Sequence, residues 1–265
     1  MQDMGVEDPS GQDGDGIPSW YDGNRVAKAR VLLVGAGSLG EETALALYGR
    51  GFRRVLMVDP GTVGRDDIGH LALVGEEDVG GFRSEVSAKN MAASTSCPGF
   101  TYHVGRVREL EGWNFEVIVG CTGDTRTRLF VNGRARLYHL PYVDTAVDGK
   151  RGKIQTVLAT GPCAECGMNR FRTRGLNARP SFEQPAPRRR VDPQTAKVVA
   201  SMASEEALRI ACGRQDLCTK GVVYYDGADG SVRTISLNVD PRCSNHEGER
   251  WKQTLKSLMQ GTGRL

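Results

Sequence analysis

One short glycine-rich stretch constrains the fold of this 265-residue chain more than any other feature. Gly35, Gly37 and Gly40 have the spacing G-x-G-x-x-G. An unbroken apolar run, residues 31–34, precedes them, and a helix-forming segment follows. A second apolar run then ends at Asp59, 19 residues after Gly40. This order of buried strand, glycine turn, helix and second strand with a terminal acid is typical of a βαβ unit that binds a nucleotide.

The residue types in this unit fit nucleotide chemistry. Glycines permit a tight turn and a close backbone approach to phosphate, and the first turn of the helix offers unpaired N–H groups. Asp59 can accept hydrogen bonds from ribose hydroxyls. The alternative, that the glycines only turn the chain, does not explain the strand before them and the helix after them. The motif does not separate ATP from NAD, so a nicotinamide-dependent oxidoreductase remains one hypothesis.

Apolar runs and helical patterns continue to alternate along the chain, which predicts an α/β fold with a Rossmann-like sheet and helices on both faces. The pattern changes after Tyr142, where two strands follow each other across Asp148-Gly149, so we expect a mixed sheet with further strands near the C-terminus. The expected strands are 30–34, 54–59, 101–107, 116–121, 142–147, 153–160, 221–226 and 232–238. The expected helices are 41–50, 85–91, 126–137, 193–212 and 251–260.

The composition divides the chain into three parts. Residues 1–24 contain six acids and no Lys or Arg, so we expect a flexible acidic leader rather than a signal peptide, and a cytoplasmic protein. Residues 25–160 would form the nucleotide-binding region. Residues 161–265 would form a C-terminal part with an arginine-rich crossover loop over 167–192. The balance of 35 Lys+Arg against 32 Asp+Glu speaks against a nucleic-acid partner, and no apolar run is long enough for a membrane span.

Two paired motifs in the C-terminal part predict a zinc site. Cys163 and Cys166 form a CxxC motif, and Cys243 and His246 form a CxxH motif. An odd total of seven cysteines argues against a disulfide framework. Three thiolates and one imidazole can hold one tetrahedral Zn²⁺, which would clamp the C-terminal part to the body and leave no open position for catalysis. A redox CxxC is weaker because no helix is predicted to start at Cys163, and two unrelated pairs are the other alternative.

Taken together, these residues resemble the ThiF/MoeB/HesA family of ubiquitin-activating-type adenylyltransferases. The resemblance implies a Rossmann-like domain with a mixed sheet, normally a homodimer. It also implies attack by a C-terminal carboxylate, usually of a small ubiquitin-like or sulfur-carrier protein, on the α-phosphate of ATP·Mg²⁺, which gives an acyl-adenylate and pyrophosphate. The motifs that carry it are VLLVGAGSLG at 31–40, Val58-Asp59, Asp78-Val-Gly80, Cys121-Thr122, the late CxxC and the helix over 198–209.

The resemblance further implies roles for single positions. The three loop glycines and the ribose-binding acid match the family. The family's Asn-x-x-Arg pattern falls on Asp67 and His70, so an acid and a histidine stand where phosphate contacts are expected. The phosphate-binding lysine falls on Arg83, which keeps the charge. The magnesium-binding aspartate is replaced by Gly123, and Asp124 follows one position later, where a shift of one residue restores a Mg²⁺ ligand.

These departures affect catalysis more than the fold, because each lost contact costs about 1–3 kcal/mol. Our leading hypothesis is an adenylyltransferase that uses ATP and Mg²⁺, with a structural Zn²⁺, and that activates a carrier protein, a peptide or a small metabolite acid. The alternative is a catalytically weakened member of the family that acts as a binding or partner subunit. No cysteine lies between Gly167 and Arg190, so no thioester or persulfide step is indicated.

Overall fold

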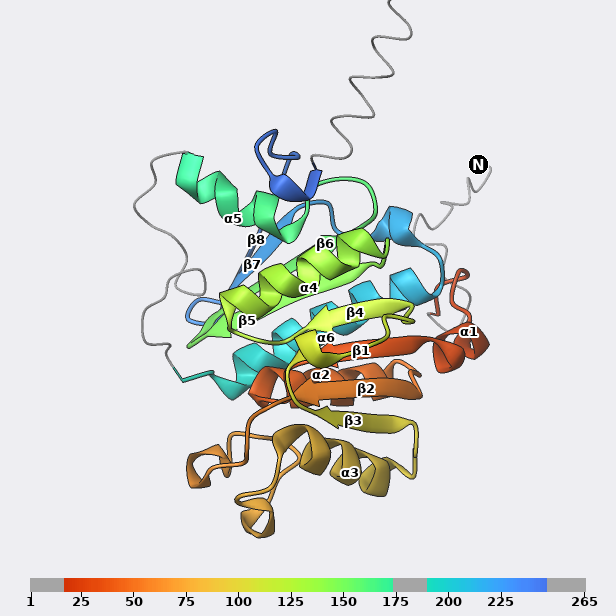
Figure 1. Ribbon diagram of the computed structural model, residues 1–265, viewed down its shortest axis with the longest axis vertical. Helices are drawn as coiled ribbons and strands as arrows, with labels where there is room; N and C mark the ends of the chain where they lie inside the picture. Colours follow the sequence, from red (N-terminus) through yellow and green to blue (C-terminus); the bar gives the residue numbers. More distant parts are fainter. Residues whose placement is uncertain (1–16, 174–189, 247–265) are drawn as a thin grey trace, which may run out of the picture.

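The computed structural model of the chain describes residues 17–173 and 190–246. Within these residues, eight strands form one sheet in the order β3-β2-β1-β4-β5-β6-β7-β8 (Figure 1). Strands β1 to β5 run parallel, whereas β6, β7 and β8 are antiparallel to their neighbours, so the predicted mixed sheet is confirmed. The strands are β1 (Arg30–Val34), β2 (Arg54–Asp59), β3 (Phe100–Val104), β4 (Val117–Gly120), β5 (Tyr142–Asp148), β6 (Arg151–Val157), β7 (Val222–Asp226) and β8 (Ser231–Ile235).

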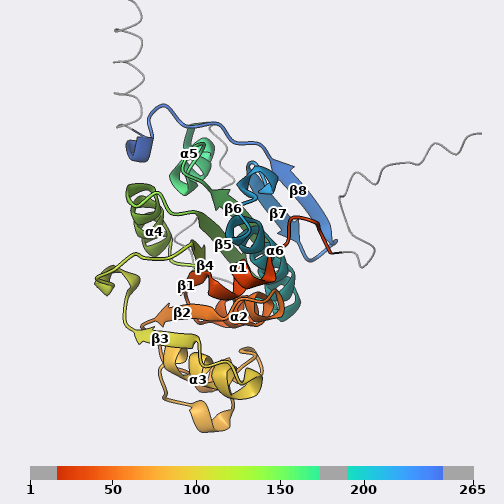
Figure 2. The same cartoon turned by 90° about the vertical axis from the view of Figure 1, so that its right-hand side faces the viewer.

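Helices cover both faces of this sheet, as the sequence predicts (Figure 2). One face carries α1 (Gly23–Lys28), α2 (Ser38–Gly49), α3 (Arg83–Thr95) and α6 (Pro193–Ala211). The other face carries α4 (Thr125–Leu137) and α5 (Ala164–Thr173). Strand β1 shows why its sequence is apolar throughout: Val31 and Leu33 pack into the first core, and Leu32 packs into the second.

The start of the crossover segment differs from the prediction. Residues 164–173 form the helix α5, so the loop expected over 167–192 does not begin at Gly167, and the expectation that no helix starts beside Cys163 is wrong. Ala164, Met168 and Phe171 follow a helical period that the sequence analysis did not use. The helix starts where the Ala164 N–H donates to the Asn132 side chain at 2.9 Å, and Cys163 and Cys166 are buried. Asn132 lies 32 residues earlier, so a local pattern does not show this contact.

Several predicted segments lie partly or wholly outside the described residues. These are most of the acidic leader, the crossover segment over 174–189 and the helix over 251–260. The two predicted parts, 25–160 and 161–265, contribute strands to the same sheet, because β6 from the first part pairs with β7 from the second. Among the described residues, none of the helices combines the length and the apolarity that a membrane span requires.

Candidate functional site

A cleft of about 660 Å³ opens at the carboxyl ends of β1, β2, β3 and β4. It is lined by Gly35 after β1, by Asp59 and Gly61 at the end of β2, by Arg83 at the start of α3, and by residues of the segments 105–108 and 122–127. In open α/β sheets, ligands bind outside the carboxyl ends of the strands, and this volume lies in the range of small-molecule sites. The cleft is therefore the candidate nucleotide site.

The three glycines of the loop have different physical roles. Gly35 has φ +104°, and an added Cβ would lie 2.9 Å from the carbonyl oxygen of Cys121. At Gly40, a Cβ would lie 2.0 Å from the carbonyl oxygen of Gly35, so the helix α2 can approach the loop only without a side chain there. Gly37 differs, because nothing lies within 4 Å of its Cβ position. Two glycines therefore shape the turn, and the third leaves open space.

Asp59 joins the loop to the end of β2. Its Oδ2 accepts a hydrogen bond from the Ala36 N–H at 3.0 Å, and its Oδ1 accepts one from the Gly61 N–H at 2.7 Å. The Arg83 Nε lies 3.5 Å from the same Oδ1. The Arg83 guanidinium rests against Gly61, where a Cβ would come within 2.1 Å of Nη2. The structure thus places the predicted ribose acid and the predicted phosphate cation beside each other in the cleft.

Asp124 also lines the cleft, where it caps the helix α4. Its Oδ2 accepts from the Thr127 N–H at 2.9 Å and from the Thr127 hydroxyl at 2.6 Å. The glycine predicted to replace the family's aspartate, Gly123, directly precedes it. A carboxylate is therefore present at this edge of the sheet, and one of its oxygens holds the helix start.

Asp67 and His70 do not line this cleft. Asp67 closes the short helix η1 (Arg65–Asp67), where its Oδ2 accepts from the Gly64 N–H at 2.9 Å. The His70 N–H donates to the Asp67 carbonyl at 2.9 Å, and the His70 Nδ1 is buried without a hydrogen-bond partner among the described residues. Their assignment to phosphate contacts remains a prediction.

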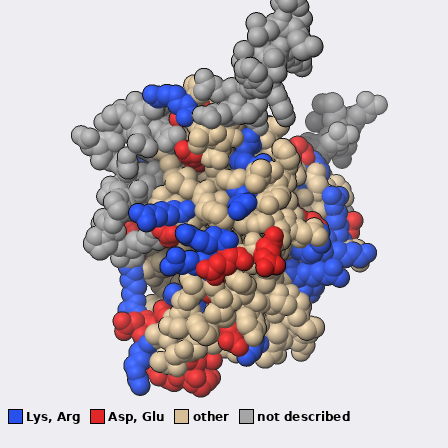
Figure 3. All heavy atoms as spheres, viewed as in Figure 1, with Lys and Arg blue, Asp and Glu red and all other residues tan. Residues whose placement is uncertain are grey.

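The sequence analysis missed three further cations in the cleft, Arg106, Arg108 and Arg126, which we call the three-arginine rim. They are exposed, and none of their guanidinium groups forms an ion pair, hydrogen bond or ring contact with another described residue, whereas the Arg106 backbone N–H donates to the Glu109 carboxylate at 3.0 Å. Together with Arg83, they bring the number of cationic side chains that line the cleft to four, whereas two carboxylates, Asp59 and Asp124, line it. Basic side chains gather over the N-terminal end of α4 on the face shown in Figure 3. The one feature of the sequence that could have identified these arginines is their position just after the ends of β3 and β4.

The four predicted metal ligands lie together. The ligand atoms of Cys163, Cys166, Cys243 and His246 all lie within 4.8 Å of one another, and all four residues are buried. The Cys163 Sγ lies 3.8 Å from that of Cys166 and 3.5 Å from that of Cys243. Tetrahedral zinc with Zn–S bonds of about 2.3 Å requires sulfur atoms about 3.8 Å apart.

Two observations bear on whether this cluster suits a metal or a redox pair. The contact with the Cys166 thiol lowers the pKa of Cys163, which favours a thiolate there. A helix does start beside Cys163, as in many redox pairs. However, two further ligands reach the same point: Cys243, directly before η6 (Ser244–His246), and His246, its last residue. The donor set therefore fits a structural Zn²⁺ better than a redox pair.

The other four cysteines are buried and do not form a nucleophile. Burial raises the pKa of Cys121 to about 11 and that of Cys218 to about 12. Cys97 and Cys212 are 8% exposed and pack in the core of one sheet face. These buried thiols fill space in the core.

A charged network lies between α4 and the sheet. The Arg128 guanidinium donates to both oxygens of Asp144 at 2.8 and 2.6 Å, and the Lys153 Nζ lies 3.5 Å away. The Tyr142 hydroxyl donates to the same carboxylate at 2.7 Å. Burial alone would raise the pKa of Asp144, but the two cations hold it well below its ordinary value. The network fixes the helix that carries Asp124 and Arg126 against the sheet.

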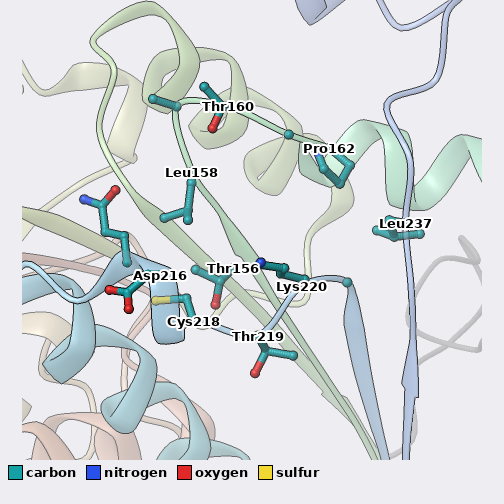
Figure 4. A pocket seen from close by; sticks show the side chains of 13 residues that line it. Thr156, Leu158, Thr160, Pro162, Asp216, Cys218, Thr219, Lys220 and Leu237 are labelled. Atoms are coloured by element: carbon teal, nitrogen blue, oxygen red, sulfur yellow. The ribbon is translucent and has the colours of Figure 1, made fainter.

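A second cavity of about 510 Å³ lies where β6 ends and β7 begins (Figure 4). Thr156 and Leu158 line it from the end of β6, and Cys218 and Lys220 line it from the turn before β7. Its lining includes neither the glycines of the loop nor any of the predicted nucleotide-binding residues. The nucleotide motif and its cations are therefore confined to the first cleft among the described residues.

Comparisons with known proteins agree with this geometry. Three curated relatives align with the chain. They are "Probable adenylyltransferase/sulfurtransferase MoeZ" of Mycobacterium tuberculosis (26% identity, 82% of this chain and 56% of the relative), the SAMP-activating enzyme E1 of Haloferax volcanii (23%, 83% and 80%) and the sulfur carrier protein adenylyltransferase of Thermus thermophilus (25%, 83% and 82%). The chain thus spans little more than half the length of MoeZ.

A solved structure of E. coli MccB with ATP covers 84% of this chain and 68% of its own, with a TM-score of 0.69 and 14% identity. At that identity, the likeness shows the fold alone. The model of the ThiF family matches residues 21–245, which is most of the chain. The resemblance inferred from the glycine loop, the strand-end acid and the late CxxC is thereby confirmed, and the chain belongs to the ThiF family.

Proposed function

We propose that the chain is an ATP-dependent adenylyltransferase that activates a carboxylate. The observation that carries this proposal is that Gly35, Asp59, Arg83 and Asp124 line one cleft. The names of the relatives agree, since one adenylylates a sulfur carrier protein and another activates SAMP. One structure of MccB contains ATP, and another contains both the nucleotide analogue AMPCPP and MccA.

The residues of the cleft suggest how the reaction proceeds. The phosphates would lie over Gly37, where an added Cβ would meet no atom within 4 Å and where α2 begins. Asp59 would accept from the ribose hydroxyls. Arg83 would offset the repulsion between the incoming carboxylate and the phosphates. A carboxylate oxygen forms a bond to the α-phosphorus while the bond from that phosphorus to the bridging oxygen breaks, and pyrophosphate leaves with the electron pair. Asp124 is the residue that would hold Mg²⁺, which neutralises the phosphates when it is bound.

The acid to be activated is proposed from the same comparisons. A small carrier protein with a free C-terminus, or a peptide, fits the names of the relatives and of MccA. A small metabolite acid is a further candidate. We also propose a homodimer, as the family resemblance implies, and a Zn²⁺ held by the Cys₃His cluster that clamps η6 to α5.

Exchange of labelled pyrophosphate into ATP tests this function. With the correct acid present, the wild-type chain should catalyse exchange, and Asp59→Asn should weaken ATP binding about tenfold or more. Asp229→Asn is the matched control, because it neutralises an acid in the turn between β7 and β8, outside the cleft. No exchange with any carrier protein, peptide or small acid would contradict the proposal.

One observation favours a second function. Gly123 stands at the family's aspartate position, and Asp67 and His70 lie outside the lining of the cleft. A chain with these losses would bind ATP without turnover and would act as a weakened binding or partner subunit. Tight binding of ATP·Mg²⁺ without exchange, together with copurification with an active homologue, would favour this function over the first.

A further inference from the structure

A glycine-rich segment, residues 62–82, leaves the cleft after Gly61 and returns to it at Arg83; we call this segment the strap. It projects from the body beside α3 (Figure 1), and an isolated β-bridge between its first and last residues closes its base. Among its residues, only Val63 and Leu71 are buried. A segment with so few buried apolar side chains opens locally at a lower cost than the core does.

Side chains of α2 and α3 hold the middle of the strap at Leu73. The Leu73 N–H donates to the Glu41 Oε2 on α2 at 2.7 Å, and the Leu73 carbonyl accepts from the Asn90 Nδ2 on α3 at 2.7 Å. The second carboxyl oxygen of Glu41, Oε1, accepts from the Ser87 hydroxyl on α3 at 2.5 Å. One carboxyl group therefore joins α2, α3 and the strap, and it does not line the cleft.

The surroundings of Glu41 favour its neutral form. Glu41 is fully buried, and burial raises its pKa to about 7 against the hydrogen bonds that it accepts. Its neighbour on α2, Glu42, raises the pKa further by repulsion, whereas Lys197 of α6 acts on Glu42. The strap presents another acid, Asp78, whose Oδ2 accepts from the uncharged Asn90 of α3 at 3.1 Å.

The two protonation states of Glu41 fit the closed strap differently. The neutral group keeps both contacts, because one oxygen accepts from the Leu73 N–H while the hydroxyl donates to the Ser87 Oγ. The ionised group keeps the same neighbours as a charge that is cut off from water, which costs free energy. An open strap lets water reach the carboxylate and removes this cost, so ionisation favours the open strap.

We propose that Glu41 is a proton-dependent latch, whose neutral carboxyl group holds the strap closed on α2 and α3 and whose ionisation releases the strap. The strap carries Asp67 and His70, the predicted phosphate contacts, so the latch makes the placement of these two side chains depend on pH. The inference does not rest on the proposed function, because the opening of the strap is measured without a nucleotide or an acid substrate.

Hydrogen exchange of the full chain at pH 5 and pH 8, corrected for the intrinsic exchange rates, tests the proposal. Between pH 4.5 and about 7 the open form has lost the proton that the closed form keeps, so the protection of the strap amides falls as the pH rises through this range. The protection of the Leu73 amide should fall at least about tenfold from pH 5 to pH 8, and about fiftyfold if opening exposes the carboxyl group fully. The amides of β1 should stay better protected than those of the strap at both pH values.

Two variants assign this effect to one side chain. Glu41→Gln keeps an acceptor for the Leu73 N–H but cannot ionise, so the protection of its strap should not change with pH. Glu42→Gln is the matched control, because it neutralises the next acid on the same helix, which acts with Lys197 rather than with the strap. Most of the fall in protection should remain in this control.

Three results would overturn the inference. One is a wild-type strap whose protection falls less than about tenfold between the two pH values. Another is a strap protected as strongly as β1, since its amides would then exchange only when the whole chain unfolds. The third is a folded Glu41→Gln variant that keeps the wild-type fall. Should Glu41→Gln fail to fold, the two wild-type measurements decide between latch and no latch.

Discussion

Replacement of Gly37 by alanine separates nucleotide binding from folding. The backbone at Gly37 has φ −84° and ψ −169°, which any residue adopts, and its added Cβ would meet no atom within 4 Å. Gly37 caps α2, where alanine is poorer than glycine, so we expect a loss of at most about 1 kcal/mol in the free energy of unfolding. The fold of the variant should therefore persist.

The same methyl group would occupy the space through which phosphates reach the N–H groups of α2. A hydrogen bond to a charged group contributes about 1.5–3 kcal/mol, so the loss of one such bond should weaken ATP binding about tenfold to 150-fold. Calorimetric titration with ATP·Mg²⁺ and a thermal melt measure the two effects. Gly40→Ala is the contrasting variant, because its Cβ would lie 2.0 Å from the Gly35 carbonyl oxygen and should destabilise the fold instead.

The reasoning fails if folded Gly37→Ala binds ATP as tightly as the wild type. In that case the phosphates would not pass over this position, and the open space there would have another purpose. A large drop in the melting temperature of Gly37→Ala would contradict it in a different way, because it would show a structural role that the backbone geometry does not predict.

Three further predictions concern the metal cluster, a buried acid and the charged network. Cys243→Ser should lose a bound zinc ion and lower the melting temperature by at least about 5 °C, as metal analysis and thermal melts would show; an equal melting temperature and no zinc in the wild type would contradict the site. Burial raises the pKa of Glu41 from 4.5 to about 7, against hydrogen bonds from Ser87 and from the backbone. Between these values the native state keeps a proton that the unfolded chain has lost, so the free energy of unfolding should fall by about 3 kcal/mol as the pH rises from 4.5 to above 7. Glu41→Gln should remove this slope in urea unfolding at pH 5 and pH 8, and an unchanged slope would contradict the assignment. Arg128→Met leaves the buried Asp144 without its bidentate partner, so urea unfolding should show a loss of about 3–5 kcal/mol; a loss under 1 kcal/mol would show that Lys153 alone suffices.

The parts of this fold that depend on local pattern are predictable from the sequence. The apolar run of β1, the glycine turn and α2 follow from burial, backbone freedom and helical period, and each lies within a few residues of its prediction. The start of helix α5 is different, because the Ala164 N–H donates to Asn132, 32 residues earlier. A contact over that separation leaves no trace in a local pattern.

The candidate site divides in the same way. Gly35, Asp59 and Arg83 are found from the motif and the family resemblance, and the cleft brings them together. The three-arginine rim has no motif, because its members line one cleft only when the carboxyl ends of β3 and β4 lie at the same end of the sheet. A rule that inspects the residues just after each parallel strand would have found them.

A crystal structure of the full chain with ATP and Mg²⁺ tests the central claim most directly. The account predicts the ribose hydroxyls within hydrogen-bond distance of Asp59, the phosphates over Gly37, and the α-phosphorus open towards the side from which a carboxylate arrives. Nucleotide bound elsewhere on the molecule, or a cleft in which Arg83 keeps its contact with Asp59 at saturating ATP and no density for nucleotide is present, would contradict it.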